Sequence, residues 1–295
     1  MRILITGTNG QVGWELERAL PMLGQPMCPR RDELDLSRPD QVRAWLDSHR
    51  PDLIVNPAAY TAVDKAEEER DLAYTINRDT PAAMAGWCAA NQVAMVHYST
   101  DYVYPGTGEQ AYDEDAPTGP TNVYGASKLA GEDAIRASGC IHLIFRTSWV
   151  YGARGKNFLI TMLRLAETMP QLRVVADQVG APTPARLIAE TTMAVLARRG
   201  MRVPDLSPVS GTYHLVAAGE VSWHGFAQAI MRARQELTGK AAPEVKAIAT
   251  SEFPTPASRP ANSRLSVTRI EQTFGLQMPG WQECLDQVIA DRLAI

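Results

Sequence analysis

A tyrosine and a lysine four residues apart are the residues of this 295-residue chain best suited to acid–base chemistry. Tyr124 and Lys128 lie in the segment Tyr-Gly-Ala-Ser-Lys, and Ser99-Thr100-Asp101 precedes it. Residues four apart share one face of a helix, so the two side chains are expected to meet. A nearby ammonium favours the phenolate and lowers the pKa of a tyrosine from its usual value of about 10. With a hydroxyl from Ser99 or Thr100 beside the same oxygen, this group could move a proton to or from an alcohol/ketone pair.

Tyr-x-x-x-Lys also recurs by chance on surface helices, so this interpretation requires a nucleotide site elsewhere in the chain. A glycine-rich segment at residues 7–13 directly follows a short apolar run and precedes a helical stretch. Glycines permit a tight turn and close backbone approach, and free N–H groups at a helix N-terminus bind a diphosphate. The spacing is G-x-x-G-x-x-G rather than G-x-G-x-x-G, and an ordinary glycine-rich turn is the alternative. The predicted dinucleotide contacts are Gly7, Asn9, Gly10, Gln11, Val12 and Gly13.

The end of the second strand is expected to meet the adenosine ribose of the dinucleotide. Arg30 and Arg31 lie there, and arginine accommodates a 2′-phosphate, so NADPH is the predicted cofactor, with NADH also accepted. Alternatively, Arg30 and Arg31 are two solvated surface charges that do not contact a cofactor. Asp35 and Leu36 are predicted to flank the adenine. Small residues after the third strand would let the cofactor pass close to the backbone at Ala58, Ala59 and Tyr60.

Strand-like and helix-like segments alternate along the first half of the chain. Apolar runs are found at residues 3–5, 53–55, 94–98 and 143–145, and helical stretches at 12–23, 39–49, 71–91 and 124–137, with Ser37 a candidate N-cap of the second. This βαβ pattern predicts an α/β fold with a Rossmann-type, doubly wound parallel sheet. Prolines punctuate shorter elements after residue 150. We expect a cofactor-binding domain at 1–147, completed by about 181–217, and a smaller, mostly C-terminal α/β substrate lobe at 148–180 and 218–295.

The composition argues against several classes of partner. Lysine plus arginine total 29 against 33 acidic residues, so a nucleic-acid partner is not expected. No apolar run reaches about 18 residues, which predicts no membrane span, and the N-terminus does not resemble a signal peptide. Four well-separated cysteines favour structural thiols in a reduced, cytoplasmic protein. They are Cys28, Cys88, Cys140 and Cys284.

These features together resemble the extended short-chain dehydrogenase/reductase superfamily. Further strings are similar to the dTDP-4-dehydrorhamnose reductases within it, and they run in order over nearly the whole chain. The strings are Thr-Ala-Val-Asp-Lys-Ala-Glu at 61–67, Ser-Thr-Asp-Tyr-Val-Tyr-Pro-Gly at 99–106, Arg-Thr-Ser-Trp-Val-Tyr at 146–151, Asp-Gln-Val-Gly-Ala-Pro-Thr at 177–183 and Arg-Pro-Ala-Asn-Ser-Arg-Leu at 259–265. Each string alone is a weak indication of this family, but the ordered set of strings is specific to it.

The resemblance implies reduction of the 4-keto group of dTDP-4-dehydro-L-rhamnose to dTDP-L-rhamnose by NAD(P)H, a step in making cell-surface polysaccharide. It implies a catalytic triad of Thr100, Tyr124 and Lys128, with Tyr124 as proton donor and Lys128 also touching the nicotinamide ribose. The implied contacts to the nucleotide sugar are Thr100, Asp101, Tyr102, Trp149, Arg259 and Asn262. Trp149 could instead serve only in core packing, and Arg259 could instead cap a helix or pair with a surface acid.

The resemblance also allows a metal ion, because some members of this family hold Mg²⁺ between carboxylates at the interface of a homodimer. The matching positions are Glu15, Glu190 and Asp291. Aspartate is one methylene shorter than glutamate, and Mg²⁺ is demanding about oxygen-ligand geometry. Solvated helix faces explain the same three acids.

Two other functions stay open at this point. A sugar-nucleotide epimerase or dehydratase of the same superfamily is one, although a dehydratase usually carries an acidic pair after the catalytic threonine and only Asp101 follows Thr100 here. A non-catalytic, cofactor-binding regulatory subunit is the other. Such proteins often lose a member of the triad, whereas this chain has all three.

Overall fold

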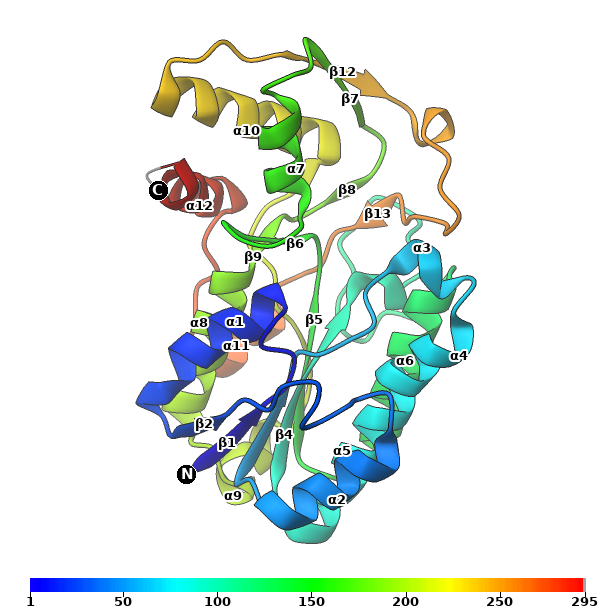
Figure 1. Ribbon diagram of the computed structural model, residues 1–295, viewed down its shortest axis with the longest axis vertical. Coiled ribbons are helices and arrows are strands. Elements are labelled where there is room, and N and C mark those ends of the chain that lie inside the picture. Colours follow the sequence, from blue (N-terminus) through cyan, green and yellow to red (C-terminus); the bar gives the residue numbers. More distant parts are fainter. Residues whose placement is uncertain (294–295) are drawn as a thin grey trace.

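The computed structural model describes residues 1–293 and is built around a six-stranded parallel sheet (Figure 1). The strand order is β10-β5-β4-β3-β1-β2. The strands are β1 (Arg2–Ile5), β2 (Gln25–Met27), β3 (Leu53–Asn56), β4 (Ala94–Thr100), β5 (His142–Thr147) and β10 (Gly211–His214). The chain moves from β2 at one edge to β3 on the far side of β1, so the winding reverses beside β1. Parallel sheets bind ligands at the carboxyl ends of the strands around such a reversal.

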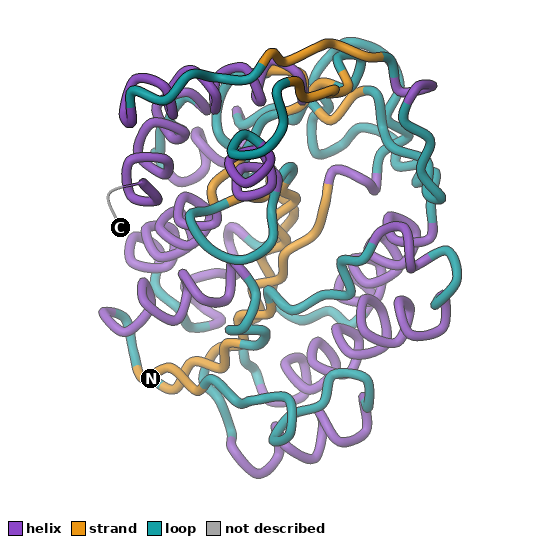
Figure 2. Tube along the Cα trace, turned by 45° about the horizontal axis from the view of Figure 1, so that its top comes forward, coloured by secondary structure: helices purple, strands orange, loops and turns teal. Residues whose placement is uncertain are grey.

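Helices cover both faces of this sheet, and in Figure 2 the strands run through the middle of the molecule between them. Ile3 and Ile5 face a core shared with α1 and α8, whereas Leu4 faces a core shared with α2, α5 and α6. This alternation follows from the two-residue period of a strand. The helices are α1 (Gln11–Ala19), α2 (Pro39–His49), α5 (Thr80–Asn91), α6 (Val123–Ala137) and α8 (Ala185–Arg199). The predicted doubly wound α/β fold is confirmed.

Shorter elements form a second lobe beyond the carboxyl ends of the sheet, at the top of Figure 1. Its core gathers apolar residues of α7, α10 and α12 and of the parallel pair β7–β12. The elements are β6 (Val150–Tyr151), α7 (Phe158–Leu165), β7 (Gln171–Val175), β8 (Val179–Gly180), β9 (Thr183–Pro184), β11 (Val221–Ser222), α10 (Trp223–Thr238), β12 (Glu244–Ile248), β13 (Asn262–Ser263) and α12 (Trp281–Leu293). The exact division at residues 147, 181 and 217 stays a prediction, and residues 294–295 of the predicted lobe lie outside the described chain.

Three details of the helices differ from the sequence-based expectation. The first helix ends at Ala19, and a 3-10 turn (Leu20–Met22) follows because Pro21 disfavours a continuing helix. The stretch expected as one helix at 71–91 is α4 (Arg70–Tyr74), a π-turn (Thr75–Asp79) and α5. Within the π-turn, buried Asn77 hydrogen-bonds to Tyr60 and to Ser127 of α6.

Ser37 does not cap α2. The N-cap position belongs to Arg38, which offers no side-chain cap, and the Ser37 hydroxyl donates to Asp35 Oδ1 at 2.8 Å. A short polar side chain can satisfy a neighbouring side chain instead of a helix end, which is why the sequence alone misassigned it.

The remaining elements are short connections. They are α3 (Val63–Ala66), α9 (Val203–Leu206), α11 (Thr268–Phe274) and the 3-10 turns η3 (Asp101–Val103), η4 (Ser207–Val209) and η5 (Thr250–Glu252). No helix within residues 1–293 is both long and apolar enough to cross a membrane. The four cysteines are free thiols, two of them fully enclosed beside the α5 face of the sheet.

Candidate active site

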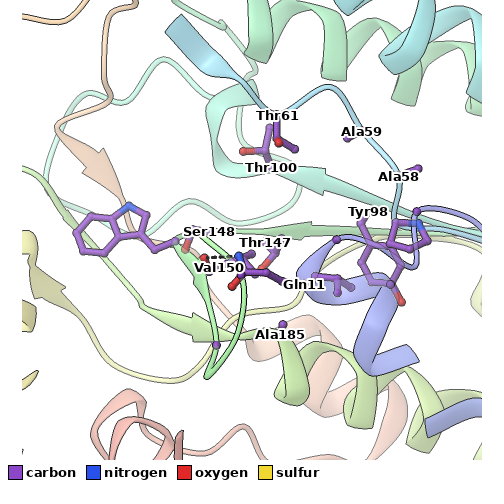
Figure 3. Close-up of a pocket in the computed structure, with 18 of the residues that line it drawn as sticks. Gln11, Ala58, Ala59, Thr61, Tyr98, Thr100, Thr147, Ser148, Val150 and Ala185 are labelled. Atoms are coloured by element: carbon purple, nitrogen blue, oxygen red, sulfur yellow. Dashed lines mark hydrogen bonds between the residues drawn. The ribbon is translucent and has the colours of Figure 1, made fainter. Parts of the chain in front are cut away.

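A cleft of about 800 Å³ opens between the carboxyl ends of the sheet strands and the second lobe. Figure 3 shows Thr100 at the end of β4, Thr147 at the end of β5, Ser148 directly after it, and Gln11 of α1 around the cleft. The cleft brings together most of the residues predicted from the sequence. These are Gly7, Asn9, Gly10, Gln11, Val12, Gly13, Ala58, Ala59, Thr100, Asp101, Tyr102, Tyr124, Lys128, Trp149 and Arg259.

The glycine-rich turn forms one end of the cleft. Gly7 has a φ of 59°, and a Cβ at Gly13 would lie only 2.2 Å from the Gly7 carbonyl oxygen, so both positions require glycine. Gly10 precedes α1 and provides no side-chain cap, which leaves the first N–H groups of the helix facing the cleft. That arrangement suits an anionic diphosphate.

A loop from the second lobe closes over this turn. Gln11 Nε2 donates to the Val150 carbonyl at 3.4 Å, and Asn157 Nδ2 donates to Gln11 Oε1 at 2.7 Å. Asn157 also caps α7, because its Oδ1 accepts from Ile160 N at 3.0 Å. The Asn157 amide therefore holds both the loop and the end of α7 in place.

Tyr124 and Lys128 project from α6 into the middle of the cleft. The Asn122 side chain caps this helix by accepting from Gly125 N at 2.8 Å, which fixes where its first turn begins. Lys128 Nζ donates to the Tyr98 carbonyl at 2.7 Å and lies 3.1 Å from His97 Nε2. Burial lowers the pKa of Lys128 to about 8, although Glu132 one turn further along α6 opposes the change.

The expected effect of the lysine on the tyrosine is wrong for this structure. Among the described residues, Lys128 makes no hydrogen bond to Tyr124, since its Nζ contacts Tyr98 O and His97 Nε2 of β4 instead. Burial raises the pKa of Tyr124 above its usual value, and interaction with the Thr100 hydroxyl only partly offsets this effect. The phenol is therefore held in its protonated form.

An acid and two hydroxyls lie beside the tyrosine. The Thr100 hydroxyl donates to Asp101 Oδ1 at 3.0 Å, and the Ser263 hydroxyl of β13 donates to Asp101 Oδ2. Burial raises the pKa of Asp101 to about 6, while these two hydrogen bonds act in the opposite direction. The carboxyl group thus fixes the Thr100 hydroxyl and titrates close to neutral pH.

Aromatic side chains form the wall on the side of the second lobe. Trp149 has a φ of 47°, which is a strained conformation for a bulky residue and is common at functional positions. Its ring stacks on Trp223 of α10 with centroids 3.7 Å apart, and both rings line the cleft half-exposed. Such a surface can pack against the apolar face of a sugar or against a base.

Arg259 reaches the same end of the cleft from the loop before β13. Its guanidinium pairs with Asp64 at 2.7 Å and donates to the Tyr102 hydroxyl at 3.2 Å. The Tyr102 ring meets the Tyr124 ring edge-on at 5.5 Å. The ion pair that was the alternative explanation of this arginine is therefore present, and it holds the guanidinium at the cleft.

Six predicted contacts lie outside the lining of the cleft. The side chains of Arg30 and Arg31 are 83% and 80% exposed in the turn after β2. The Asn262 amide is used by loop carbonyls, including that of Gln110 at 2.8 Å. The others are Asp35, Leu36 and Tyr60, whose hydroxyl donates to Glu69.

The three acids matched to a metal site do not form one in this chain. Asp291 pairs with Arg186 at 2.7 Å, and Arg186 also acts on the pKa of Glu15. Within residues 1–293 no three His, Cys, Asp or Glu side chains are grouped so as to hold a metal ion. The Arg186 guanidinium already supplies positive charge beside these acids, and a Mg²⁺ site shared between two copies of the chain stays a prediction.

Some residues of the cleft were not identified from the sequence. Trp223 is one, and its position directly after Ser222, which caps α10, was the available signal. Thr147 is another, because its buried hydroxyl oxygen has no hydrogen-bond partner although the residue lines the cleft; Ser99, which the sequence offered as the alternative to Thr100, shares both features. Buried polar atoms are rarely left unpaired, so these two hydroxyls are suited to contact a bound ligand.

Comparisons with known proteins agree with this geometry. The family model described as RmlD substrate binding domain matches residues 1–294. A dTDP-4-dehydrorhamnose reductase from Burkholderia thailandensis is 46% identical over 297 residues, covering 100% of each chain. The crystal structure of a dTDP-4-dehydrorhamnose reductase from Clostridium acetobutylicum has a TM-score of 0.91 at 36% identity and covers 100% of each chain. That of the Bacillus anthracis enzyme in complex with NADP has a TM-score of 0.89 at 35% identity, covering 98% of this chain and 99% of the other.

Proposed function

The chain belongs to the RmlD substrate binding domain family, and from this premise we propose that it reduces the 4-keto group of dTDP-4-dehydro-L-rhamnose to give dTDP-L-rhamnose. Membership of this family makes it an NAD(P)H-dependent oxidoreductase. The observation that carries the specific proposal is the cleft in which a protonated tyrosine, a buried lysine and a hydroxyl lie beside a glycine-rich turn. The bound nicotinamide supplies the hydride.

Tyr124 donates the proton to the developing alkoxide. Its raised pKa keeps the phenol protonated at neutral pH, which suits a proton donor. Lys128, fully enclosed in a site of low dielectric, stabilises the phenolate that is left behind. The Thr100 hydroxyl, held by Asp101, positions the carbonyl oxygen.

The second lobe holds the nucleotide-sugar end of the substrate in this proposal. Arg259, positioned by Asp64, binds the diphosphate, because a guanidinium fits phosphate oxygens in a bidentate manner. Trp149 and Trp223 form an aromatic surface for the deoxysugar or the base. Asn262 holds its own loop and contributes to the site only by shaping it.

NADPH is the cofactor in this proposal, and Arg30 and Arg31 bind its 2′-phosphate from the solvent side. Their exposure is consistent with this role, since a phosphate outside the cleft meets side chains that are free to move. Replacing both by alanine should raise KM for NADPH about tenfold and leave KM for NADH unchanged. Equal effects on both cofactors would remove the pair from the 2′-phosphate site.

The decisive assay follows NADPH absorbance in the presence of dTDP-4-dehydro-L-rhamnose. Tyr124→Phe should retain NADPH binding, measured by fluorescence titration, and lose about 10²- to 10⁴-fold in kcat. The matched control is Tyr74→Phe, on α4 outside the cleft, which should leave kcat unchanged. Unchanged turnover in the Tyr124 variant would exclude this tyrosine from the mechanism. Turnover of the sugar without net NADPH oxidation would favour an epimerase.

A further inference from the structure

The hydrogen bonds of Lys128 continue into the sheet through three buried polar side chains. Thr6 directly follows β1, Asn56 ends β3 and His97 lies in β4, and each is at most 1% exposed. The Thr6 hydroxyl donates to Asn56 Oδ1 at 2.6 Å, and Asn56 Nδ2 lies 3.1 Å from His97 Nδ1. His97 Nε2 lies 3.1 Å from Lys128 Nζ, so the row ends at the lysine.

The parallel register of the sheet creates this row. Asn56 pairs with His97, and Ile5 with Val55, so residues 6, 56 and 97 stand side by side on one face. Each of these three residues stands two positions after an apolar residue of the core beneath α2, α5 and α6. Residues two apart in a strand point to the same face of the sheet. Those apolar residues are Leu4, Ile54 and Met95.

The direction of these hydrogen bonds restricts the charge of the lysine. With the Asn56 carbonyl accepting from Thr6, its amide must donate to His97 Nδ1, which therefore carries no proton. Burial keeps the pKa of His97 well below its usual value, so the ring is neutral and its one proton lies on Nε2. An Nε2–H facing Lys128 Nζ requires a lone pair on that nitrogen, and the lysine is then a neutral amine.

A protonated lysine requires the opposite arrangement. The ammonium donates to Nε2, the imidazole proton lies on Nδ1, and the Asn56 amide turns so that its oxygen accepts from Nδ1–H and its nitrogen donates to the Thr6 oxygen. The imidazole holds one proton in both arrangements. The row as a whole differs by the single proton that Lys128 gains from the cleft.

We propose that His97 is a positioning residue for Lys128, and that its ring tautomer, linked through Asn56 to Thr6, follows the charge of the lysine. Lys128, with a pKa lowered to about 8, changes charge in the range where this enzyme would work. The other charged or titratable groups that face the pair lie on α6 and β5: Tyr124 and Glu132, and His142 and Arg146. Arg146 pairs with Glu132 at 2.6 Å and so reduces the pull of this carboxylate on the lysine.

The inference concerns the lysine of the proposed reductase site and so rests in part on the proposed function. A row that keeps a hydrogen bond to Lys128 in either charge state would hold the Lys128 side chain in one place throughout turnover. An unpaired buried donor would otherwise displace the chain or cost stability. His97 acts only through Lys128 and does not line the cleft.

The direct test is NMR of protein labelled with ¹⁵N-histidine, without nucleotide or sugar, recorded from about pH 6.5 to about pH 9.5. Long-range ¹H–¹⁵N couplings distinguish the two tautomers, and loss of one signal set in His97→Gln assigns the residue. His97 should stay neutral, with the proton on Nδ1 below pH 8 and on Nε2 above it. A single tautomer over the whole range, or formation of imidazolium, would overturn the proposal. This measurement stands even if no sugar is turned over.

Steady-state kinetics provide a second test of the role of His97. His97→Leu leaves the lysine one partner short and should lower kcat about 10- to 100-fold, with KM for NADPH changed less than about twofold. His97→Gln, which can still hydrogen-bond Lys128, should recover part of this loss, and His142→Gln on β5 is the matched control. The carboxylate in Asn56→Asp can only accept a hydrogen bond, so it fixes the imidazole proton on Nδ1 of His97, which is the arrangement that suits protonated Lys128. The alkaline limb of the kcat profile should therefore move up by about one pH unit or more. An unmoved limb, or equal losses in the His97 and His142 variants, would contradict the assignment.

Discussion

Replacing Asp101 by asparagine should remove a pH-dependent loss of stability that this carboxyl group imposes on the folded protein. Asp101 is 3% exposed, and burial raises its pKa from 3.8 to about 6. Between these two values the folded protein holds a proton that the unfolded chain has released. The free energy of unfolding therefore falls as pH rises through this window.

The magnitude follows from the size of the pKa change. One pKa unit corresponds to about 1.4 kcal/mol, so a rise from 3.8 to about 6 corresponds to about 3 kcal/mol in total. About 2 kcal/mol of this falls between about pH 4.5 and about pH 8, because the unfolded carboxyl is already largely ionised at the lower pH. Asparagine keeps the shape and can still pair with Thr100 and Ser263, so the fold should be retained.

Urea unfolding of both proteins across this pH range gives the required comparison, since all other titrating groups are shared. The stability of Asp101→Asn relative to the parent should increase by about 2 kcal/mol from the acidic to the alkaline end. A difference that stays constant with pH would show that Asp101 titrates normally. A difference of opposite sign would show that the two hydroxyls outweigh burial and hold the pKa of this carboxyl below 3.8.

Three further substitutions test other parts of the structure. Glu132→Gln leaves the Arg146 guanidinium buried without its carboxylate and should lower the free energy of unfolding by about 3 kcal/mol in a urea titration; a loss below about 1 kcal/mol would refute this. Gly180→Ala places a Cβ 2.9 Å from the Trp149 ring and should reduce kcat/KM for the sugar nucleotide about tenfold while NADPH affinity, measured by titration, is kept; a parallel loss of NADPH affinity would point to general disruption. Arg259→Lys keeps the charge but not the bidentate geometry, so steady-state KM for the sugar nucleotide should rise about tenfold, and an unchanged KM would place the diphosphate elsewhere.

The fold was predictable because its signals are local. Alternating apolar runs and helical stretches led to a parallel sheet, and the ordered strings led to the family. What failed were helix details governed by tertiary contacts. The π-turn at Thr75–Asp79 forms where Asn77 can reach Tyr60 and Ser127, and neither partner is evident from spacing along the chain.

The sequence predicted many of the residues that line the cleft but not their electrostatics. Four-residue spacing correctly put Tyr124 and Lys128 on one helix, yet it led to a wrong expectation for the pKa of the phenol. Lys128 Nζ instead contacts Tyr98 O and His97 Nε2, and both of these residues lie in β4. Local spacing carries no information on such competing partners, nor on burial, which dominates both pKa values.

Polar residues at the ends of buried runs were the missed signal. Thr6, Asn56 and His97 each interrupt an apolar segment near its carboxyl end, where a purely structural strand would continue with apolar residues. The register of the sheet places these three polar residues side by side, so that their hydrogen bonds form a continuous row that ends at Lys128.

The second lobe contributes to the acid–base chemistry as well as to substrate binding. Ser263 of β13 holds the carboxyl of Asp101, and Arg259 from the preceding loop holds the Tyr102 hydroxyl. Both contacts act on residues that adjoin Tyr124. Burial is the largest cause of the raised pKa values of Tyr124 and Asp101, whereas the hydrogen bond from Ser263 acts against it at Asp101. The second lobe therefore takes part in setting the pKa of the carboxyl group that holds the Thr100 hydroxyl for the proposed reaction.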